Sequence, residues 1–287
     1  MSPTPASTPS PAPTVPANVL SIAGTDPTGG AGIQADLKTF GALGTYGMAV
    51  VTAVVAQNTQ AVRMVSPLAP ELVQAQLEAV FEDVAVAAVK IGMVANAEIA
   101  EVIAEVLARH RPPFVVLDPV MAASTHKRLM NESDLERIRT ALLPQVSLLT
   151  PNLKEAARLL GIAQPVDEAG MRACLPALQA LGVPNVLLKG GHLADGAPES
   201  TDLLATPESV IRLSAPRITT RHGHGTGCTL SSAIAALWPQ HGLEKATRMA
   251  KDYVHGALLH ADALQVGHGR GPLHHFWQAV HLPGQLA

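Results

Sequence analysis

The segment HGHGTGCTLSSAIAAL, residues 222–237, places three glycines and one of the two cysteines of the chain within seven residues. Behind them Leu230, Ile234 and Leu237 recur at three- and four-residue intervals, as in an amphipathic helix. The glycines therefore precede a helix, whose first N–H groups lack internal partners and carry partial positive charge. Residues 225–228 are predicted to bind an anion, although the same residues also suit a plain turn with an N-cap.

Cys228 lies at the start of this predicted helix, and its position permits several chemistries. Helix N-termini lower the pKa of thiols, so Cys228 is predicted to be partly thiolate near neutral pH and to act as a nucleophile, or as a base toward a substrate hydroxyl. Together with His222 and His224 it also suggests a zinc site, but no fourth ligand is evident nearby. The other cysteine, Cys174, falls in an apolar helical pattern and is interpreted as a core residue.

A second glycine-rich segment, GTDPTGGAG at residues 24–32, leads into another helical pattern. Paired glycines let the backbone approach a ligand closely, and the Asp26-Pro27 pair makes a turn. The segment lacks the spacing of a dinucleotide loop and of a Walker loop, and neither motif occurs elsewhere in the chain. A nucleotide would therefore be held by another arrangement.

Polar residues with possible metal or phosphate chemistry follow three apolar runs. Asp118 stands before a proline, where a carboxylate can hold Mg²⁺ or its waters, or simply form an Asp-Pro turn. Asn152 and Glu155 have the spacing of an N-cap and its partner at the third helical position, which does not exclude a metal role. Lys189 precedes two glycines, where it can meet phosphate oxygens or remain a solvated strand end.

The elements that must position these residues are short runs rich in Val, Ile and Leu, which alternate with helical patterns. Such continuous apolar runs are typical of strands buried on both faces of a parallel sheet. We expect strands within residues 18–24, 48–57, 86–93, 114–120, 146–152 and 185–191. A helix over residues 70–84 is expected to have one apolar face made of Leu72, Ala75, Ala79 and Val80.

This alternation predicts one doubly wound α/β domain over residues 18–287, preceded by a disordered tail at residues 1–17 that is rich in Pro, Ser, Thr and Ala. In such folds ligands bind beyond the carboxyl ends of the strands. The glycine-rich segments and the polar residues that follow the predicted strands are therefore expected to meet at one edge of the sheet.

Composition and charge narrow the function classes. The chain has 287 residues, 47% of them hydrophobic and 15% charged, with a formal net charge of −3 and scattered Lys and Arg. Nucleic acid and anionic membranes are therefore not expected as partners. The chain shows neither a signal-peptide pattern nor a membrane-span pattern, and two cysteines suit a reducing compartment, so we expect a cytoplasmic enzyme.

The motifs between Asn18 and Phe276 resemble a known family. They are IAGTDPTGGAGIQADLKTF, TAVVAQNTQAV, KIGM, DPVM, TPNLKEA, LLKGGH, HGTGCTLSSA and GHGRGP, in that order. In these motifs the chain is similar to the hydroxymethylpyrimidine/phosphomethylpyrimidine kinases of thiamine biosynthesis, within the ribokinase-like superfamily. The resemblance implies a three-layer α/β sandwich with a mostly parallel central sheet and helices on both faces. It also implies a homodimer.

The activity implied by the resemblance is phosphorylation of 4-amino-5-hydroxymethyl-2-methylpyrimidine by ATP and Mg²⁺, first to the monophosphate and then to the diphosphate. Gln57 should contact the aminopyrimidine edge. The rest of the pyrimidine pocket should be lined by Gly24, Ala31, Met93 and Val120.

The resemblance also assigns the phosphate end of the site. The anion hole should be formed by Gly225, Thr226, Gly227 and Cys228, and the thiol stands where many relatives have a catalytic aspartate. Asp118 and Glu155 should serve the Mg²⁺ end together with Asn152, and Lys189 should contact the nucleotide phosphates.

One segment departs from the family pattern. Residues 123–128, ASTHKR, replace a small flexible Ser-Gly element and predict a stiffer, more basic flap. Two other functions remain open at this stage: a pyridoxal or pyridoxine kinase of the same branch, and a pyrimidine-binding regulatory protein that has lost turnover. A zinc enzyme or thiol hydrolase is a more distant alternative.

Overall fold

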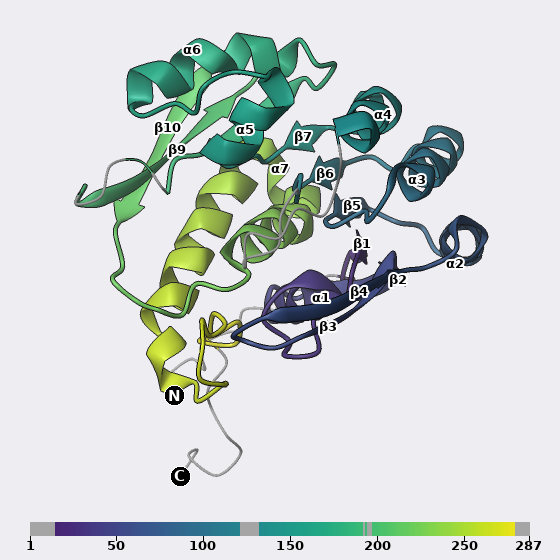
Figure 1. Cartoon of the computed structure of the whole chain (residues 1–287), viewed down its shortest axis with the longest axis horizontal. Coiled ribbons are helices and arrows are strands. Elements are labelled where there is room, and N and C mark those ends of the chain that lie inside the picture. Colours follow the sequence, from purple (N-terminus) through teal and green to yellow (C-terminus); the bar gives the residue numbers. More distant parts are fainter. Residues whose placement is uncertain (1–14, 121–131, 192, 194–196, 279–287) are drawn as a thin grey trace, which may run out of the picture.

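The computed structural model describes residues 15–120, 132–191, 193 and 197–278 (Figure 1). Its centre is an eight-stranded sheet with the strand order β10-β9-β8-β7-β6-β5-β1-β2. Neighbouring strands from β8 to β2 are parallel, whereas β9 is antiparallel to both β8 and β10. The strands are β1 (Asn18–Ala23), β2 (Tyr46–Val51), β5 (Ala88–Ile91), β6 (Val115–Leu117), β7 (Leu148–Leu149), β8 (Asn185–Lys189), β9 (Glu199–Ala205) and β10 (Val210–Pro216).

Helices cover both faces of this sheet, and each face has its own apolar core. One core packs against α2 (Pro70–Phe81), α3 (Ala97–His110), α4 (Glu132–Leu142), α5 (Leu153–Leu160) and α6 (Glu168–Gln179). The other packs against α1 (Gly32–Ala42) and α7 (Thr226–Leu259), which has a break at Gly242. Short 3-10 turns lie at Leu143–Gln145 and Ala261–Ala263. The predicted three-layer α/β architecture is confirmed.

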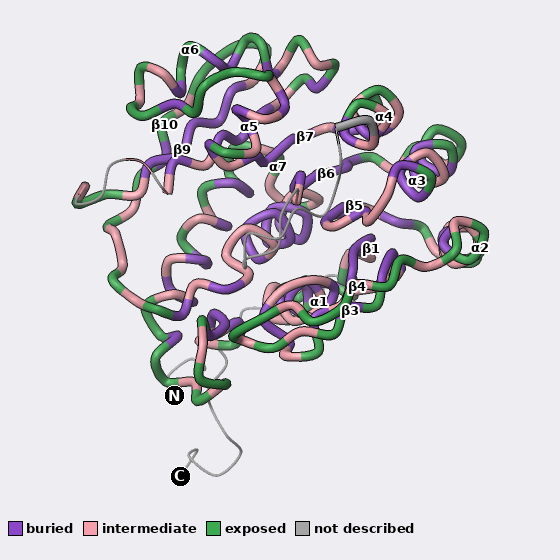
Figure 2. Tube along the Cα trace, viewed as in Figure 1, coloured by how far each residue is buried: buried purple, intermediate pink, exposed green. Residues whose placement is uncertain are grey.

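The strands are apolar on both sides because both sides are covered. In β1, Val19 belongs to the core under α1 and α7, whereas Leu20 and Ile22 belong to the opposite core. All three side chains are 0% exposed, and Figure 2 shows the same burial along the central strands. The continuous apolar runs of the sequence therefore reflect a sheet without a solvent face.

The run predicted as one strand over residues 48–57 is two strands in the structure. Its first part is β2 of the main sheet. The second part, β3 (Ala53–Gln57), leaves that sheet and pairs with β4 (Val62–Pro67) in a separate antiparallel hairpin. Burial alternates along β3, with Val55 buried and Val54 53% exposed. Since both are valines, composition alone does not reveal the change of sheet.

The strictly alternating order of strands and helices is also wrong near β9 and β10, because the described residues include no helix between β8 and β9 or between β9 and β10. β10 is largely exposed, so it lacks the apolar run by which the other strands were recognised. The predicted apolar face of α2 is wrong as well. Val73 and Leu77 are its buried residues, and Leu72 is 51% exposed.

Two expectations concern residues that the structure does not describe. Most of the predicted tail, residues 1–14, and the departing segment 123–128 lie outside the described residues. The domain bounds of 18–287 remain a prediction. Within the described part of the chain, no helix is both long and apolar enough to cross a membrane.

Candidate active site

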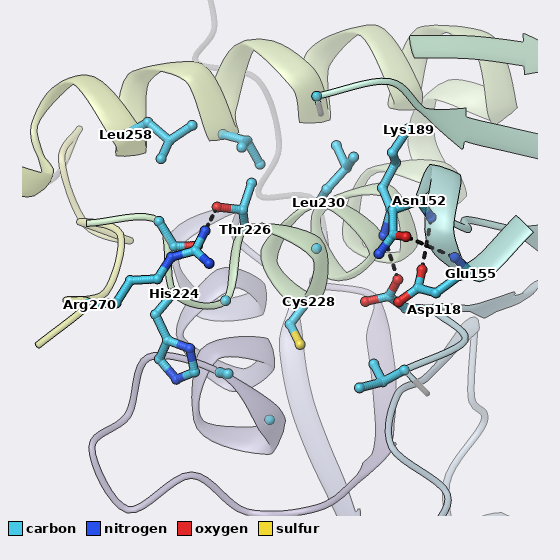
Figure 3. Close-up of a pocket in the computed structure, with 18 of the residues that line it drawn as sticks. Asp118, Asn152, Glu155, Lys189, His224, Thr226, Cys228, Leu230, Leu258 and Arg270 are labelled. Carbon is cyan, nitrogen blue, oxygen red and sulfur yellow. Dashed lines mark hydrogen bonds and ion pairs between the residues drawn. The ribbon is translucent and has the colours of Figure 1, made fainter. Parts of the chain in front are cut away.

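The carboxyl ends of the parallel strands border a cavity of about 490 Å³ (Figure 3). Its wall includes residues from β1, β5 and β8, the β3–β4 hairpin and the start of α7. Every site residue that the family resemblance assigns lines it: Gly24, Ala31, Gln57, Met93, Asp118, Val120, Asn152, Glu155, Lys189, Gly225, Thr226, Gly227 and Cys228. The structure thus brings together residues that are spread over more than two hundred positions.

The start of α7 forms a bare backbone surface in this cavity. Gly225 is the N-cap and has a φ of 83°, a left-handed conformation that favours glycine. A Cβ atom on Gly225 would collide with the carbonyl oxygen of Gly30, and one on Gly227 would lie 3.2 Å from both Asp118 Oδ2 and Lys189 Nζ. The first N–H groups of α7 are therefore exposed to a ligand without side chains between them.

Asp26 and His224 connect the two glycine-rich segments. Asp26 is fully buried and accepts hydrogen bonds from the backbone N–H groups of Thr28, Gly30 and Ala31. His224 Nε2 lies 2.8 Å from Asp26 Oδ2. Burial raises the pKa of Asp26, but hydrogen bonds from His224 and Thr28 outweigh burial and hold that pKa well below its usual range. Asp26 thus remains ionised and organises both loops.

A group of acidic and basic side chains, Asp118, Glu155 and Lys189, lies on the side of Cys228 opposite His224 in Figure 3. Lys189 Nζ donates to Asp118 Oδ1 at 2.7 Å, and Asp118 is 2% exposed. Asn152 caps α5 by accepting from the backbone N–H groups of Lys154 and Glu155, while Glu155 Oε2 accepts from the backbone N–H of Asn152. The predicted capping arrangement is confirmed, and it holds the Glu155 carboxylate at the cavity wall.

Burial and the neighbouring charges together shift the pKa values of Glu155 and Lys189. Burial raises the pKa of Glu155 to about 7, an effect that the positive charge of Lys189 opposes and the negative charge of Asp118 adds to. Burial lowers the pKa of Lys189, but the charges of Asp118 and Glu155 more than compensate, so its pKa is raised. A cationic Lys189 beside two carboxyl groups suits a site that receives phosphate oxygens and a divalent cation.

The pKa of the Cys228 thiol differs from the value expected from the sequence. The pKa is raised to about 11, because burial outweighs the positive charge of Lys90 and a hydrogen bond from the Gly32 backbone, and the charges of Asp36 and Asp118 act in the same direction as burial. The prediction of a partly ionised thiol near neutral pH is therefore wrong for this structure. The helix N-terminus lies near the sulfur, but desolvation is the larger effect.

The opposite side of the cavity provides a compact apolar pocket. A Cβ on Gly24 would collide with the Met93 methyl group, so a side chain there would require the flexible Met93 side chain to move. The same pocket includes Ala31, Val120 and the β3–β4 hairpin, with Gln57 at the end of β3. A pocket with small residues in its wall and the Gln57 amide at its rim suits a flat heterocycle with polar substituents.

Several cavity residues were not found by sequence reasoning. An apolar wall is made by Ala215, Pro216, Ile218, Val254 and Leu258. Beside it Lys251 Nζ donates to Asp202 Oδ2 at 2.6 Å. Arg270, from the GHGRGP motif, donates to the Gly223 carbonyl at 3.2 Å. Of these residues only Arg270 belonged to a quoted motif, because the wall combines β9 and β10, which the sequence did not reveal, with the far end of α7.

The chain and its fold are similar to known proteins. The family model described as phosphomethylpyrimidine kinase matches residues 26–274. The chain belongs to the phosphomethylpyrimidine kinase family. A hydroxymethylpyrimidine/phosphomethylpyrimidine kinase of Salmonella typhimurium is 53% identical over 260 residues, which cover 90% of this chain and 97% of the relative. One of Escherichia coli is 52% identical over 260 residues, with the same coverage.

Solved structures show that the family fold extends to pyridoxal kinases. A Bacillus subtilis pyridoxal kinase in complex with ADP is 31% identical, with a TM-score of 0.85 over 92% of this chain and 99% of that one. A phosphomethylpyrimidine kinase of Clostridium difficile is 39% identical, with a TM-score of 0.74 over 84% of this chain and 99% of that one. The ribokinase-like fold expected from the sequence is confirmed.

The described residues contain no group of three or more His, Cys, Asp or Glu side chains that suits a metal ion. The zinc interpretation of His222, His224 and Cys228 therefore finds no support in the geometry. Mg²⁺ has other requirements, because it commonly keeps several waters and takes only one or two carboxylates together with substrate phosphates. Asp118 and Glu155 fit that pattern.

Proposed function

We propose that this kinase uses ATP to phosphorylate 4-amino-5-hydroxymethyl-2-methylpyrimidine to its monophosphate and then to its diphosphate. The observation that carries the proposal is the position of the α7 N-terminus. Its bare N–H groups lie in one cavity with the Lys189–Asp118 pair and with the small pocket around Gly24 and Met93. A phosphate and a flat heterocycle can therefore meet beside Cys228.

The chain's contribution to phosphoryl transfer is positioning and electrostatic stabilisation. The transferring group spreads negative charge over its oxygens, which the first N–H groups of α7 are placed to stabilise. Lys189 adds a fixed positive charge on the same side. The apolar wall of Pro216, Val254 and Leu258 supports binding of the ATP base at the far end of the cavity.

Magnesium would be held through Asp118 and Glu155, the carboxyl groups at this end of the cavity. When bound, it supplies positive charge that offsets the charge on the phosphates. Asn152 keeps Glu155 in place through the α5 capping box. These residues present oxygen atoms, which Mg²⁺ prefers over nitrogen or sulfur.

The two phosphorylations make different demands on Cys228. A hydroxymethyl group must lose a proton as it attacks phosphorus, and Cys228 is the ionisable group of the helix start that can receive it. The monophosphate already presents ionised oxygens near neutral pH, because the second pKa of a phosphate ester is about 6. The second phosphorylation therefore needs no base.

The test is ATP-dependent product formation in the presence of Mg²⁺, resolved by mass. Hydroxymethylpyrimidine, its monophosphate and pyridoxal are offered side by side. We expect the monophosphate and diphosphate of the pyrimidine. Pyrimidine binding without ATP consumption would instead support the regulatory protein and refute the proposal.

Pyridoxal phosphorylation is the second candidate, because the Bacillus subtilis pyridoxal kinase has a TM-score of 0.85 to this chain. The identity to the pyrimidine kinases is higher, 53% against 31%. Phosphorylation of pyridoxal alone in the same assay would favour this candidate.

A homodimer is supported by the outer face of the β3–β4 hairpin. Val54 is 53% exposed and Met64 is 65% exposed, and the register places both on the same face, since Ala56 pairs with Met64. We expect this apolar face to be covered by a second copy of the chain. Light scattering of the wild type and of Met64→Lys tests this, and a monomeric wild type would contradict it.

A further inference from the structure

A cluster that contains an ion pair is buried between the sheet and helices α1 and α7. It consists of Ser21 on β1, Asp36 on α1, Lys90 on β5 and Ser232 on α7, and each is 0% exposed. Ser21 and Lys90 are register partners in neighbouring parallel strands, so their side chains point to the same face of the sheet. We call these four residues the buried lysine cluster.

Asp36 is the centre of this cluster. Lys90 Nζ donates to its Oδ1 at 2.9 Å and to its Oδ2 at 2.8 Å. Ser21 donates to Oδ2 at 2.6 Å and Ser232 to Oδ1 at 2.7 Å. Burying two charges costs free energy that their attraction often fails to recover, and apolar side chains of similar size are frequently as stable. Stability therefore gives no reason for a lysine here, so its neighbours must be considered.

Cys228 is the neighbour that would use this charge. Ser232 follows it by one helical turn, so the bond to Asp36 attaches the start of α7 to the cluster. Lys90 reaches the cavity wall as Cys228 does. A Cβ on Gly92 would come within 2.7 Å of Lys90 Nζ, so the glycine leaves room for the ammonium group.

The charged groups that act on the thiol come from four elements. Lys90 is the largest influence that lowers the pKa of Cys228, while Asp36 on α1 and Asp118 after β6 raise it. Lys189 on β8 is a second cation within electrostatic reach, since Cys228 contributes to the raised pKa of Lys189. In Figure 3 the Cys228 side chain lies between His224 and the group formed by Asp118, Glu155 and Lys189.

We propose that Lys90 is a positioning residue for the first phosphorylation, because its buried ammonium group stabilises the thiolate of Cys228 that accepts the hydroxymethyl proton. This inference rests on the proposed function. The hydroxymethyl O–H bond breaks and its proton goes to Sγ, while the oxygen forms a bond to the γ-phosphorus. The bond from that phosphorus to the bridging oxygen breaks, and ADP leaves with the electron pair. The thiol then returns its proton to solvent.

The direct test is the pH dependence of alkylation at Cys228 by iodoacetamide, measured on the resulting peptide so that Cys174 is counted separately. In Lys90→Met we expect the rate at Cys228 to fall at least tenfold at each pH between 7 and 9, because the thiolate fraction falls when the pKa of the thiol rises. An unchanged profile would overturn the proposal.

Lys251→Met is the matched control, because it removes another lysine–aspartate pair from the wall of the same cavity. It should leave the alkylation profile of Cys228 unchanged. Lys90→Met also leaves Asp36 without its counter-charge, which can prevent folding. Lys90→Met/Asp36→Asn avoids that unpaired charge, and a smaller fall in the alkylation rate at Cys228 is expected from it, because loss of Lys90 raises the pKa of the thiol, loss of Asp36 lowers it, and Lys90 is the larger influence.

Turnover separates this role from a structural one. Phosphorylation of the hydroxymethyl substrate should fall at least tenfold in Lys90→Met and less in the double variant, while phosphorylation of the monophosphate should stay within about twofold of wild type in both. An equal loss of both activities would mean that Lys90 only supports the fold, and the proposal would be wrong. If the wild type phosphorylated neither pyrimidine, the proposed function would fail, whereas the alkylation profile would still report whether Lys90 acts on Cys228.

Discussion

Asp26 and His224 are 198 residues apart in the chain and are joined by a buried contact of 2.8 Å between Oδ2 and Nε2. Asp26 belongs to the glycine-rich loop after β1, and His224 directly precedes the N-cap of α7. The contact therefore fixes the loop that borders the pyrimidine pocket against the backbone that faces the phosphate. The ionised Asp26 carboxylate therefore sets the position of the two ligand sites relative to each other.

Asp26→Asn is expected to lower both stability and activity. Asparagine offers one carbonyl oxygen where the carboxylate accepts bonds from Thr28, Gly30, Ala31 and His224. We expect the free energy of unfolding to fall by about 2–4 kcal/mol, because several buried donors lose their acceptor. Urea unfolding measures the loss, and kcat/KM for both substrates should fall together.

Asp167→Asn is the matched control for this change. Asp167 caps α6 in an exposed position and accepts a bond from Gly170. Its replacement should cost at most about 1 kcal/mol. Equal losses in the two variants would show that Asp26 acts only as an ordinary turn residue.

Gly225→Ala is expected to lower kcat strongly, although Gly225 has no side chain that could contact the substrate. The new methyl group would collide with the Gly30 carbonyl, so the start of α7 would have to move. Displaced N–H donors no longer stabilise the transferring phosphoryl group, and removal of one such donor typically costs about 100- to 1,000-fold in kcat. Steady-state kinetics with the monophosphate as substrate measures this.

Gly161→Ala is the control that distinguishes the effect of backbone strain from the effect of the collision with the Gly30 carbonyl. Gly161 ends α5 with a φ of 66°, and no other atom lies within 4 Å of the position its Cβ would take. This variant should lose about 1 kcal/mol of stability and keep its kcat. A comparable loss of kcat in both variants would argue against the collision.

The fold and the candidate site follow from the sequence to different extents. The central parallel strands were predictable because strands covered on both faces are continuously apolar, as at residues 114–117. The cavity residues were predictable because polar side chains such as Asp118 and Lys189 end those runs. The α7 start was predictable from glycines followed by the helical spacing of Leu230 and Ile234.

The remainder depends on tertiary environment. The pKa of Cys228 could not be foreseen, because a helix start favours the thiolate while burial favours the thiol, and only the packed structure shows that burial is larger. The Asp26–His224 contact and the buried lysine cluster join residues far apart in the chain, with no local spacing to mark them. β10 is largely exposed and only its Leu213 is buried, so it lacks the continuous apolar run of the central strands.

Cys228→Ala is expected to separate the two phosphorylations. Loss of the proton acceptor should lower the rate with hydroxymethylpyrimidine by about 100-fold or more, because general-base catalysis contributes about 10²–10⁴. The rate with the monophosphate should change little. Since the pKa of Cys228 is about 11, the wild-type rate with the hydroxymethyl substrate should rise between pH 7 and 9 in proportion to the thiolate fraction, and this rise should be absent in the variant.

Cys174→Ala is the control for removing a thiol. Cys174 is 4% exposed in the core under α6, and its hydrogen bond goes to the Met171 carbonyl. We expect reduced stability with an unchanged ratio of the two activities. If Cys228→Ala reduced both phosphorylations equally, the thiol would not act as a base.

Glu155→Gln is expected to stabilise the protein at high pH in the absence of nucleotide and metal. The pKa of Glu155 is raised from 4.5 to about 7 by burial. A group whose folded-state pKa is raised contributes stability below its unfolded pKa and loses that contribution as pH rises through the folded value. The stability of the wild type relative to the variant should therefore fall between about pH 4.5 and pH 7. Above that window the variant should be more stable by on the order of 2 kcal/mol, since it never ionises.

Urea unfolding at pH 4.5 and at pH 8 measures this difference, and Glu244→Gln is the control. Glu244 is 55% exposed and pairs with Arg248 on the surface of α7. Its replacement should leave the pH dependence of stability as in the wild type, because an exposed carboxylate is solvated in both the folded and the unfolded state. For each variant, the difference in stability from the wild type is compared between the two pH values. If this difference changed no more in Glu155→Gln than in Glu244→Gln, the pKa of Glu155 would not be raised.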